Sequence, residues 1–185
     1  MTKLFSILIF FSIAYCQSLV PIDSVNIYKD SIVEDFSAID KNGNAISFVY
    51  DILSDESVIV LVFFRGFWWP YCRKQLVELS KLNLPSKVKI YAISNENYNK
   101  SKSLQKQLHL KNSINFLQDI SGDVFDYFGI IDPRYSGSKR EGIPYASTYV
   151  INKNRKVTYA YIALDYKARQ SNKIIMNEII KALNE

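Results

Sequence analysis

The most continuous apolar segment of the chain lies before its middle. Residues 57–64 are almost all hydrophobic and rich in valine and isoleucine, which is typical of a strand buried on both faces of a parallel sheet. Residues 70–82 follow with leucines at 76, 79 and 82, a helical spacing, and Pro70 suits the first turn of a helix. The sequence therefore predicts a buried strand, a short loop and a helix in direct succession.

The remaining pattern completes an alternation of strands and helices. Residues 31–48 predict a β-hairpin that turns at 40–44. Further strands are expected at 87–93, 114–117, 147–152 and 157–163, a loop at 130–145, and further helices at 98–110, 124–128 and 169–183. This order predicts the α/β fold class: one domain with a central mixed β-sheet, an N-terminal β-hairpin and helices on both faces.

The start of the chain has the pattern of a secretory signal peptide. A lysine precedes an apolar run, and small residues occupy the −3 and −1 sites of a cut before Gln17. We therefore expect a signal peptide at 1–16, a single domain at 17–185, and a secreted or periplasmic protein. Two alternatives stay open: an uncleaved membrane anchor, and a lipoprotein modified at Cys16, which the bulky Tyr15 disfavours.

Composition limits the partners and cofactors. The formal net charge is +5, but the lysines are scattered without a basic stripe, so no nucleic-acid binding is expected. Once the signal is cleaved, no membrane contact is expected either. His109 and the one cysteine of the mature chain cannot supply a metal site. No nucleotide-binding motif occurs, so neither a metal nor a cofactor is expected.

Cys72 stands at the most informative place in the chain. It falls in the first turn of the helix after the buried strand, where free backbone N–H groups and the positive end of the helix dipole favour a thiolate. Trp69 stands three residues earlier, where a CxxC protein has its other sulfur. Without residues 1–16, Cys72 is the sole cysteine and cannot form an internal disulfide. Its thiol is then reactive, buried and inert, or paired with another molecule.

Several co-linear motifs resemble the redoxin and peroxiredoxin-like proteins of the thioredoxin-like superfamily, the alkyl hydroperoxide reductase and thiol-specific antioxidant (AhpC/TSA) family. Residues 34–44 are similar to the family's PdF…dxnG opening, and residues 61–76 to LvFyRGxWCPYCxxqL. Residues 117–129 are similar to lsD…yG, 148–152 to TyVId, and 161–169 to a terminal YxGxDYxxR. The resemblance covers nearly the whole mature chain and implies a thioredoxin-like sandwich.

The resemblance also implies an activity. Peroxiredoxins use a PxxxTxxC loop whose sole cysteine falls where Cys72 falls, which implies a thiol-dependent peroxidase. Its partners would be a hydroperoxide substrate and an external thiol reductant. Two positions depart from the pattern: Trp69 replaces the threonine and lacks its hydroxyl, and Ala146 stands where the usual arginine, or the cis-proline of thioredoxins, would lie. The cation that stabilises the thiolate must therefore come from elsewhere.

Seven residues form the predicted site. We expect the catalytic residues to be Cys72, Arg73 and Arg65, and the substrate pocket to comprise Trp69, Pro70, Tyr71 and Arg169. The three arginines are the candidates for the missing cation, since an arginine after a buried strand must find a partner or reach solvent.

A function without catalysis stays open. In that alternative the fold is a binding or structural module whose site has decayed, and Cys72 is a small, inert residue on the inner face of its helix. A homodimer linked through Cys72 is a further expectation that the single mature cysteine allows. The alternatives differ in whether the Cys72 thiol reacts.

Overall fold

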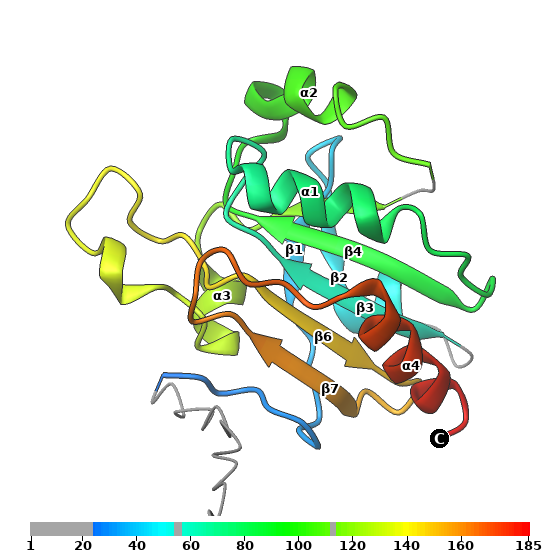
Figure 1. Cartoon of the computed structure of the whole chain (residues 1–185). Helices are drawn as coiled ribbons and strands as arrows, with labels where there is room; N and C mark the ends of the chain where they lie inside the picture. The colour runs from blue at the N-terminus through cyan, green and yellow to red at the C-terminus, as the bar shows by residue number, and fades with distance from the viewer. Residues whose placement is uncertain (1–23, 54–56, 112–113) are drawn as a thin grey trace, which may run out of the picture.

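A single mixed sheet forms the centre of the computed structural model, which describes residues 24–53, 57–111 and 114–185 (Figure 1). Across those residues the strands are β1 (Ser37–Ile39), β2 (Ala45–Ser47), β3 (Val58–Phe63), β4 (Val88–Ser94), β5 (Asn115–Gln118), β6 (Ser147–Ile151) and β7 (Val157–Ile162). The helices are the π turn η1 (Phe48–Ile52), α1 (Pro70–Leu79), α2 (Tyr98–Lys106), α3 (Asp123–Phe128), the 3₁₀ turn η2 (Pro133–Tyr135) and α4 (Asn172–Leu183). The strands lie in the order β2-β1-β5-β4-β3-β6-β7.

The sheet is parallel at its centre and antiparallel towards both edges. β3, β4 and β5 run parallel, and helices α1 and α2 lie in the connections between them, because parallel strands need a crossover. β6 pairs antiparallel with β3, and β7 with β6, while the β1–β2 hairpin joins the other side through β5. The predicted α/β class, with its mixed sheet and N-terminal hairpin, is confirmed.

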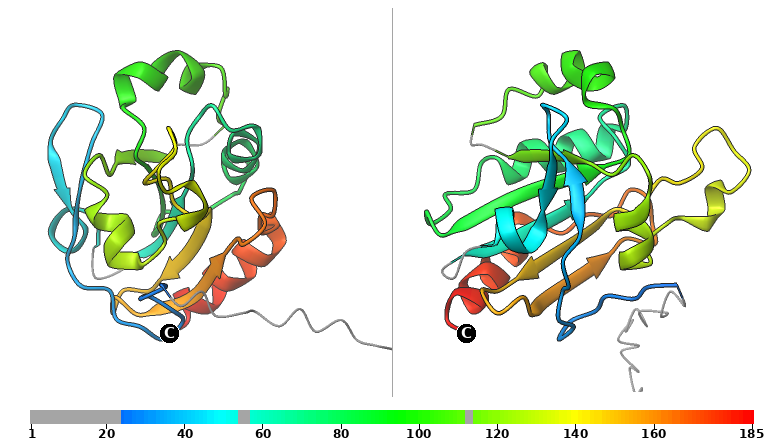
Figure 2. Two further views of the ribbon diagram at one scale, coloured as in Figure 1. Left: turned by 90° about the vertical axis from the view of Figure 1, so that its left-hand side faces the viewer. Right: turned by 180° about the vertical axis from the view of Figure 1, so that it is seen from behind.

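β3 is buried on both faces, as its continuous apolar run predicts. Ile59, Leu61 and Phe63 point into a core shared with α3, η1 and the N-terminal segment, whereas the alternate valines pack with α1 and α4. Figure 2 shows α3 and α4 on opposite sides of the sheet. Burial of each large apolar side chain contributes roughly 1.5–3 kcal/mol, so both layers hold β3 in place.

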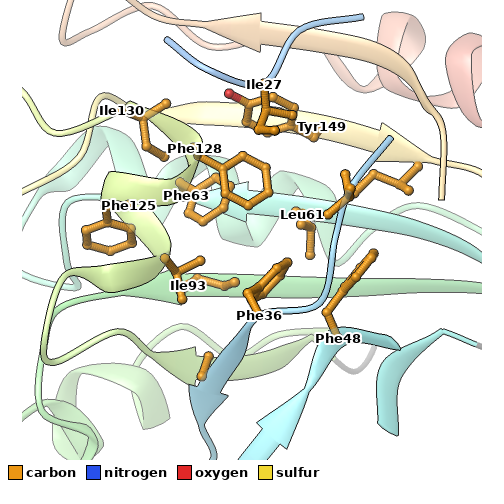
Figure 3. Packing of buried hydrophobic residues seen from close by; sticks show 14 of the residues in the cluster. Ile27, Phe36, Phe48, Leu61, Phe63, Ile93, Phe125, Phe128, Ile130 and Tyr149 are labelled. Carbon is orange, nitrogen blue, oxygen red and sulfur yellow. The ribbon is translucent and has the colours of Figure 1, made fainter. Parts of the chain in front are cut away.

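Aromatic packing fixes the carboxyl end of β3 (Figure 3). The Phe63 ring centroid lies 4.7 Å from that of Phe128 and 5.8 Å from that of Tyr149. In the same core, Phe36 stacks on Phe48 at 4.9 Å. Since Phe63 is the last residue of β3, the segment that leads from it to Cys72 starts from a rigid point.

The N-terminal hairpin is shorter than predicted. β1 begins only at Ser37, and β2 ends at Ser47 because the next residues form a π turn. In that turn the Leu53 backbone N–H donates to the Phe48 carbonyl at 2.9 Å, and Ser47 Oγ accepts from the Tyr50 N–H. The turn places the side chains of Phe48 and Ile52 in the core. In a continued strand, successive side chains would point to opposite faces of the sheet.

Three helices differ from their predicted bounds by three residues or more. α1 ends at Leu79 rather than 82, where Ser80 Oγ turns back to donate to the Val77 carbonyl. α2 ends at Lys106 rather than 110, and His109 with a φ of 47° is left-handed and cannot continue a helix. α4 starts at Asn172 rather than 169 because Ser171 is its N-cap. Arg169 is therefore in the loop before α4.

Three segments meet at the carboxyl end of β3. Phe63 pairs with Ser147 and Ser147 pairs with Ile162, so this end lies beside the start of β6 and the end of β7. The loop after β3, the 130–145 segment and the loop between β7 and α4 gather at the same end of the sheet (Figure 1). The sequence-predicted site residues all come from these loops or from the first turns of α1.

Candidate active site

Cys72 is buried under the first turn of α1. Trp69 is the N-cap residue and adopts an extended conformation, Pro70 opens the helix, and the Cys72 N–H donates to the Trp69 carbonyl at 3.0 Å. The Cys72 side chain is 0% exposed and packs in the apolar layer between α1 and the sheet. The position near the helix N-terminus favours a thiolate, whereas the apolar burial opposes one. Whether the thiol or the thiolate is favoured therefore depends on the other groups that contact the sulfur.

Arg169 contacts the sulfur directly. Its Nη2 donates to Cys72 Sγ at 3.1 Å, and its Nη1 donates to the backbone carbonyls of Tyr166 at 3.0 Å and Ala168 at 2.6 Å. The carbonyls orient the guanidinium without neutralising it. In the described part of the chain no carboxylate pairs with Arg169. Its positive charge is therefore directed at the sulfur.

Arg65 has a different set of partners. It is 0% exposed, its Nη2 pairs with Asp132 Oδ2 at 2.6 Å, and its Nη1 donates to the Tyr135 hydroxyl at 2.8 Å. Asp132 is itself buried and also accepts two hydrogen bonds from Arg134: Nε donates to Oδ1 at 2.8 Å, and Nη2 donates to Oδ2 at 2.7 Å. That hydrogen bonding to Asp132 raises the pKa of Arg134. The network ties the 130–145 segment to the end of β3.

The aromatic residues of the predicted pocket form a cluster over this region. The Trp69 ring lies 5.5 Å from Tyr166 and 6.3 Å from Tyr71, and the Arg65 guanidinium lies 5.9 Å from the Trp69 centroid. Within residues 24–53, 57–111 and 114–185, the buried Trp69 Nε1 has no hydrogen-bond partner. Trp69 thus connects the Arg65 network to the Tyr71–Tyr166 surface.

The remaining predicted residues lie at the edge of this arrangement. Arg73 is half-buried, and within the described residues its side chain has no hydrogen bond or ion pair. Pro70 is exposed and opens the helix without a polar contact of its own. The structure therefore groups Cys72 with Arg169, and places Arg65 in a separate ion network nearby.

A cavity of about 500 Å³ lies between α1 and the start of α4. Its lining comes from α1 and from the start of α4 with the preceding loop: Tyr71, Lys74, Gln75, Glu78, Lys167, Arg169, Gln170, Ser171 and Asn172. Cys72 is not part of the lining, but Arg169 belongs both to the wall of the cavity and to the contacts of the sulfur.

The predicted site residues did not include Asp132, which pairs with Arg65, or the two lysines of the cavity, Lys74 and Lys167. A buried arginine after a strand requires a carboxylate partner, so the sequence predicts that such a partner exists. It does not show which of the acidic residues of the chain, here Asp132, is that partner. In the sequence, Lys74 and Lys167 look like the many other lysines of the chain. Only the fold brings them to the wall of one cavity. No sequence signal distinguishes them.

The described residues form neither a metal cluster nor a membrane-spanning helix. Among residues 24–53, 57–111 and 114–185 no group of three or more His, Cys, Asp or Glu side chains is arranged to hold a metal ion. None of the helices in these ranges combines the length and apolar character needed to cross a membrane. The predicted signal peptide at 1–16 lies outside the described residues.

The sheet order, with a cysteine in the first turn of the helix after β3, defines a thioredoxin-like protein of the peroxiredoxin-like class. Residues 30–160 match the family model of the AhpC/TSA family, which is more than half of the chain. The chain belongs to the AhpC/TSA family.

Solved structures agree with this fold. A peroxiredoxin-like protein from Aquifex aeolicus superposes with a TM-score of 0.72 at 13% identity, over 85% of this chain and 88% of that one. Peroxidoxin BcpB from Mycobacterium tuberculosis gives 0.64 at 21% identity, over 86% and 96%. AhpC from Enterococcus faecalis gives 0.68 at 15% identity, over 84% and 93%. A comparison with curated proteins found no match. At these identities the structural likeness establishes the fold alone.

Proposed function

We propose that this protein is a single-cysteine, thiol-dependent peroxidase in which Arg169 stabilises the Cys72 thiolate. The observation that carries the proposal is the 3.1 Å contact from Arg169 Nη2 to Cys72 Sγ. A cationic donor without a carboxylate partner favours a negative charge on the sulfur, and the helix N-terminus adds to that effect. Membership of the AhpC/TSA family and the peroxiredoxin names of several structural relatives support the same activity.

The reaction follows the ordinary chemistry of a peroxidatic thiol. The thiolate attacks one oxygen of the hydroperoxide, so that an S–O bond forms as the O–O bond breaks. The leaving oxygen takes up a proton and departs as water or an alcohol. The sulfur loses two electrons and becomes a sulfenic acid, and the peroxide gains them. Two equivalents of an external thiol then return Cys72 to its reduced form with release of water and a disulfide.

Access to the sulfur requires a local opening. Cys72 is fully buried, and the loop between β7 and α4 that holds Arg169 carries the exposed residues Leu164 and Tyr166. Short surface loops of this kind open at a small fraction of the cost of global unfolding. A molecule as small as hydrogen peroxide needs only a slight displacement of this loop.

The complete burial of Cys72 is also the observation that favours the second candidate function. A thiol that no solute reaches is inert, and the fold would then serve as a binding or structural module. A homodimer linked through Cys72 would need the sulfur to become exposed to another protein surface. With either candidate function, we also propose that the protein is exported through the signal peptide predicted at 1–16.

Trapping of the sulfenic acid tests the two candidates. The protein is treated with hydrogen peroxide and dimedone, and peptide mapping locates the adduct. We expect an adduct on the peptide that contains Cys72, formed faster than on a free cysteine peptide, and loss of peroxide consumption in Cys72→Ser. An adduct that forms no faster than on the free peptide would contradict the proposal and support the inert module.

A further inference from the structure

We propose that the cavity between α1 and α4 binds the reductant, and that this reductant is a small thiol carrying a carboxylate. The inference rests on the proposed peroxidase function and assigns the partner that restores Cys72. The cavity of about 500 Å³ has the size of a small-molecule site. It shares Arg169 with the sulfur, so a molecule bound there lies against the side chain that contacts the reacting atom.

The size of the reductant follows from the burial of the sulfur. Cys72 is the only cysteine in the described part of the chain, and cleavage of the signal proposed at 1–16 removes Cys16, so in the mature chain the reducing thiol comes from another molecule. The sulfur is 0% exposed beneath α1 and the loop before α4. A cysteine fixed on the surface of a folded protein would have to displace this whole cover, whereas a small thiol can bind in the cavity and lie against Arg169, the side chain that contacts the sulfur.

The charge of the reductant follows from the wall of the cavity. Lys74, Lys167 and Arg169 line it, and within the described residues none of them forms an ion pair with a carboxylate, while Asp165 acts on Lys167 only from a distance. Glu78, the one acidic side chain of the lining, is already paired with Lys81 at 2.6 Å. The cavity therefore has an excess of positive charge, which attracts an anion and disfavours a cation.

The chemical step balances with this partner. The thiolate of the bound reductant attacks the sulfur of the Cys72 sulfenic acid, an S–S bond forms, and the hydroxyl leaves as water after taking a proton. A second molecule of the same thiol attacks the mixed disulfide and releases the small disulfide together with reduced Cys72. The two thiol molecules supply the two electrons that the peroxide removed.

The test compares N-acetylcysteine with N-acetylcysteine amide, which differ in one carboxylate. The protein is oxidised with one equivalent of hydrogen peroxide, and the loss of Cys72 sulfenic acid is followed after each thiol is added. Each rate is normalised to that of the same thiol with the neutral disulfide 4,4′-dithiodipyridine. We expect the carboxylate to accelerate the reduction about fivefold at low salt, and high salt to remove most of this preference.

Charge variants locate the effect in the cavity. The double variant Lys74→Gln, Lys167→Gln is expected to lose most of the preference. Lys153→Gln, which removes one lysine charge from the exposed turn between β6 and β7, is expected to keep it. Sulfenic acid formation is measured separately in each protein. If it forms and both thiols reduce it at the same normalised rate, the inference is overturned while the peroxidase function stands. If it does not form, the proposed function fails and takes this inference with it.

Discussion

Two arginines at the same end of the sheet have opposite electrostatic surroundings. Arg65 is fully buried and shares Asp132 with Arg134, so its charge is compensated by a carboxylate at 2.6 Å. Arg169 is half-buried, donates from Nη1 to backbone carbonyls and from Nη2 to the thiol, and its buried Nε has no partner among the described residues. The first guanidinium holds a loop to the end of β3, whereas the second has a charge left to act on Cys72. Proximity to the site does not decide the role of an arginine; its counter-charge does.

The largest expected effect comes from removing the carboxylate that pairs with Arg65. Asp132→Ala should lower the free energy of unfolding by about 3–5 kcal/mol, because it leaves the buried Arg65 charge unpaired. Urea denaturation measures the change, and the exposed Asp126→Asn in α3 serves as a control with an effect within about 0.5 kcal/mol.

A companion variant separates the charge from the packing. Adding Arg65→Met to Asp132→Ala removes the unpaired charge and should recover a large part of the lost stability. If the double variant is no more stable than Asp132→Ala alone, the cost lies in the loop contacts of Asp132 and not in an uncompensated arginine.

The next effect concerns the uncompensated arginine. Arg169→Gln should slow sulfenic acid formation at Cys72 about tenfold, equivalent to about 1.4 kcal/mol, because the thiolate loses its cationic donor. Arg169→Lys, which keeps the charge, should retain more of the rate. Stopped-flow reaction with hydrogen peroxide gives both values. An equal loss in the two variants would show that the guanidinium acts by shape and not by charge.

The smallest effect concerns the loop that connects the two regions. Glu96 Oε2 accepts the Phe67 N–H at 2.6 Å between Arg65 and Cys72, and burial raises the pKa of Glu96 above its ordinary value of 4.5. The folded state therefore binds this proton more tightly than the unfolded state, so the stability contributed by Glu96 is greatest at low pH and is lost as the pH rises through the folded pKa.

Glu96→Gln should accordingly stabilise the protein at pH 7, by less than about 1 kcal/mol because the half-exposed carboxyl is screened by solvent. The difference should vanish below pH 4.5, where the native carboxyl is also neutral. Thermal unfolding of the two proteins at pH 7 and below pH 4.5 checks both expectations. A variant that is less stable at pH 7 would show that the hydrogen bond to Phe67 outweighs the burial of the charge.

Much of the fold could be predicted because it depends on periodicity. The continuous apolar run of β3 and the leucine spacing of α1 depend on the local chain and do not require knowledge of distant contacts. The π turn η1 could not be predicted, because its apolar residues also fit the end of a strand. The start of α4 was missed for a related reason: Ser171 determines it, but the residues before it are also compatible with a helix.

The site was less predictable than the fold. The place of Cys72 follows from its strand and helix, but its partner lies 97 residues away, and three arginines were equally plausible from the sequence. The choice among them depends on where each guanidinium points, which tertiary packing decides. Arg65 required a buried acid and Arg169 required none, and neither property is visible without the loops around them.

The pH dependence of Cys72 alkylation tests the central claim most directly. Iodoacetamide reacts with the thiolate, so the midpoint of its rate against pH reports how strongly the protein favours that form. Because Arg169 donates to the sulfur, we predict a midpoint below that of a free cysteine peptide in the native protein, and a midpoint closer to the peptide's value in Arg169→Gln. A native midpoint at or above that of the peptide, or slow alkylation at every pH in both proteins, would contradict the account.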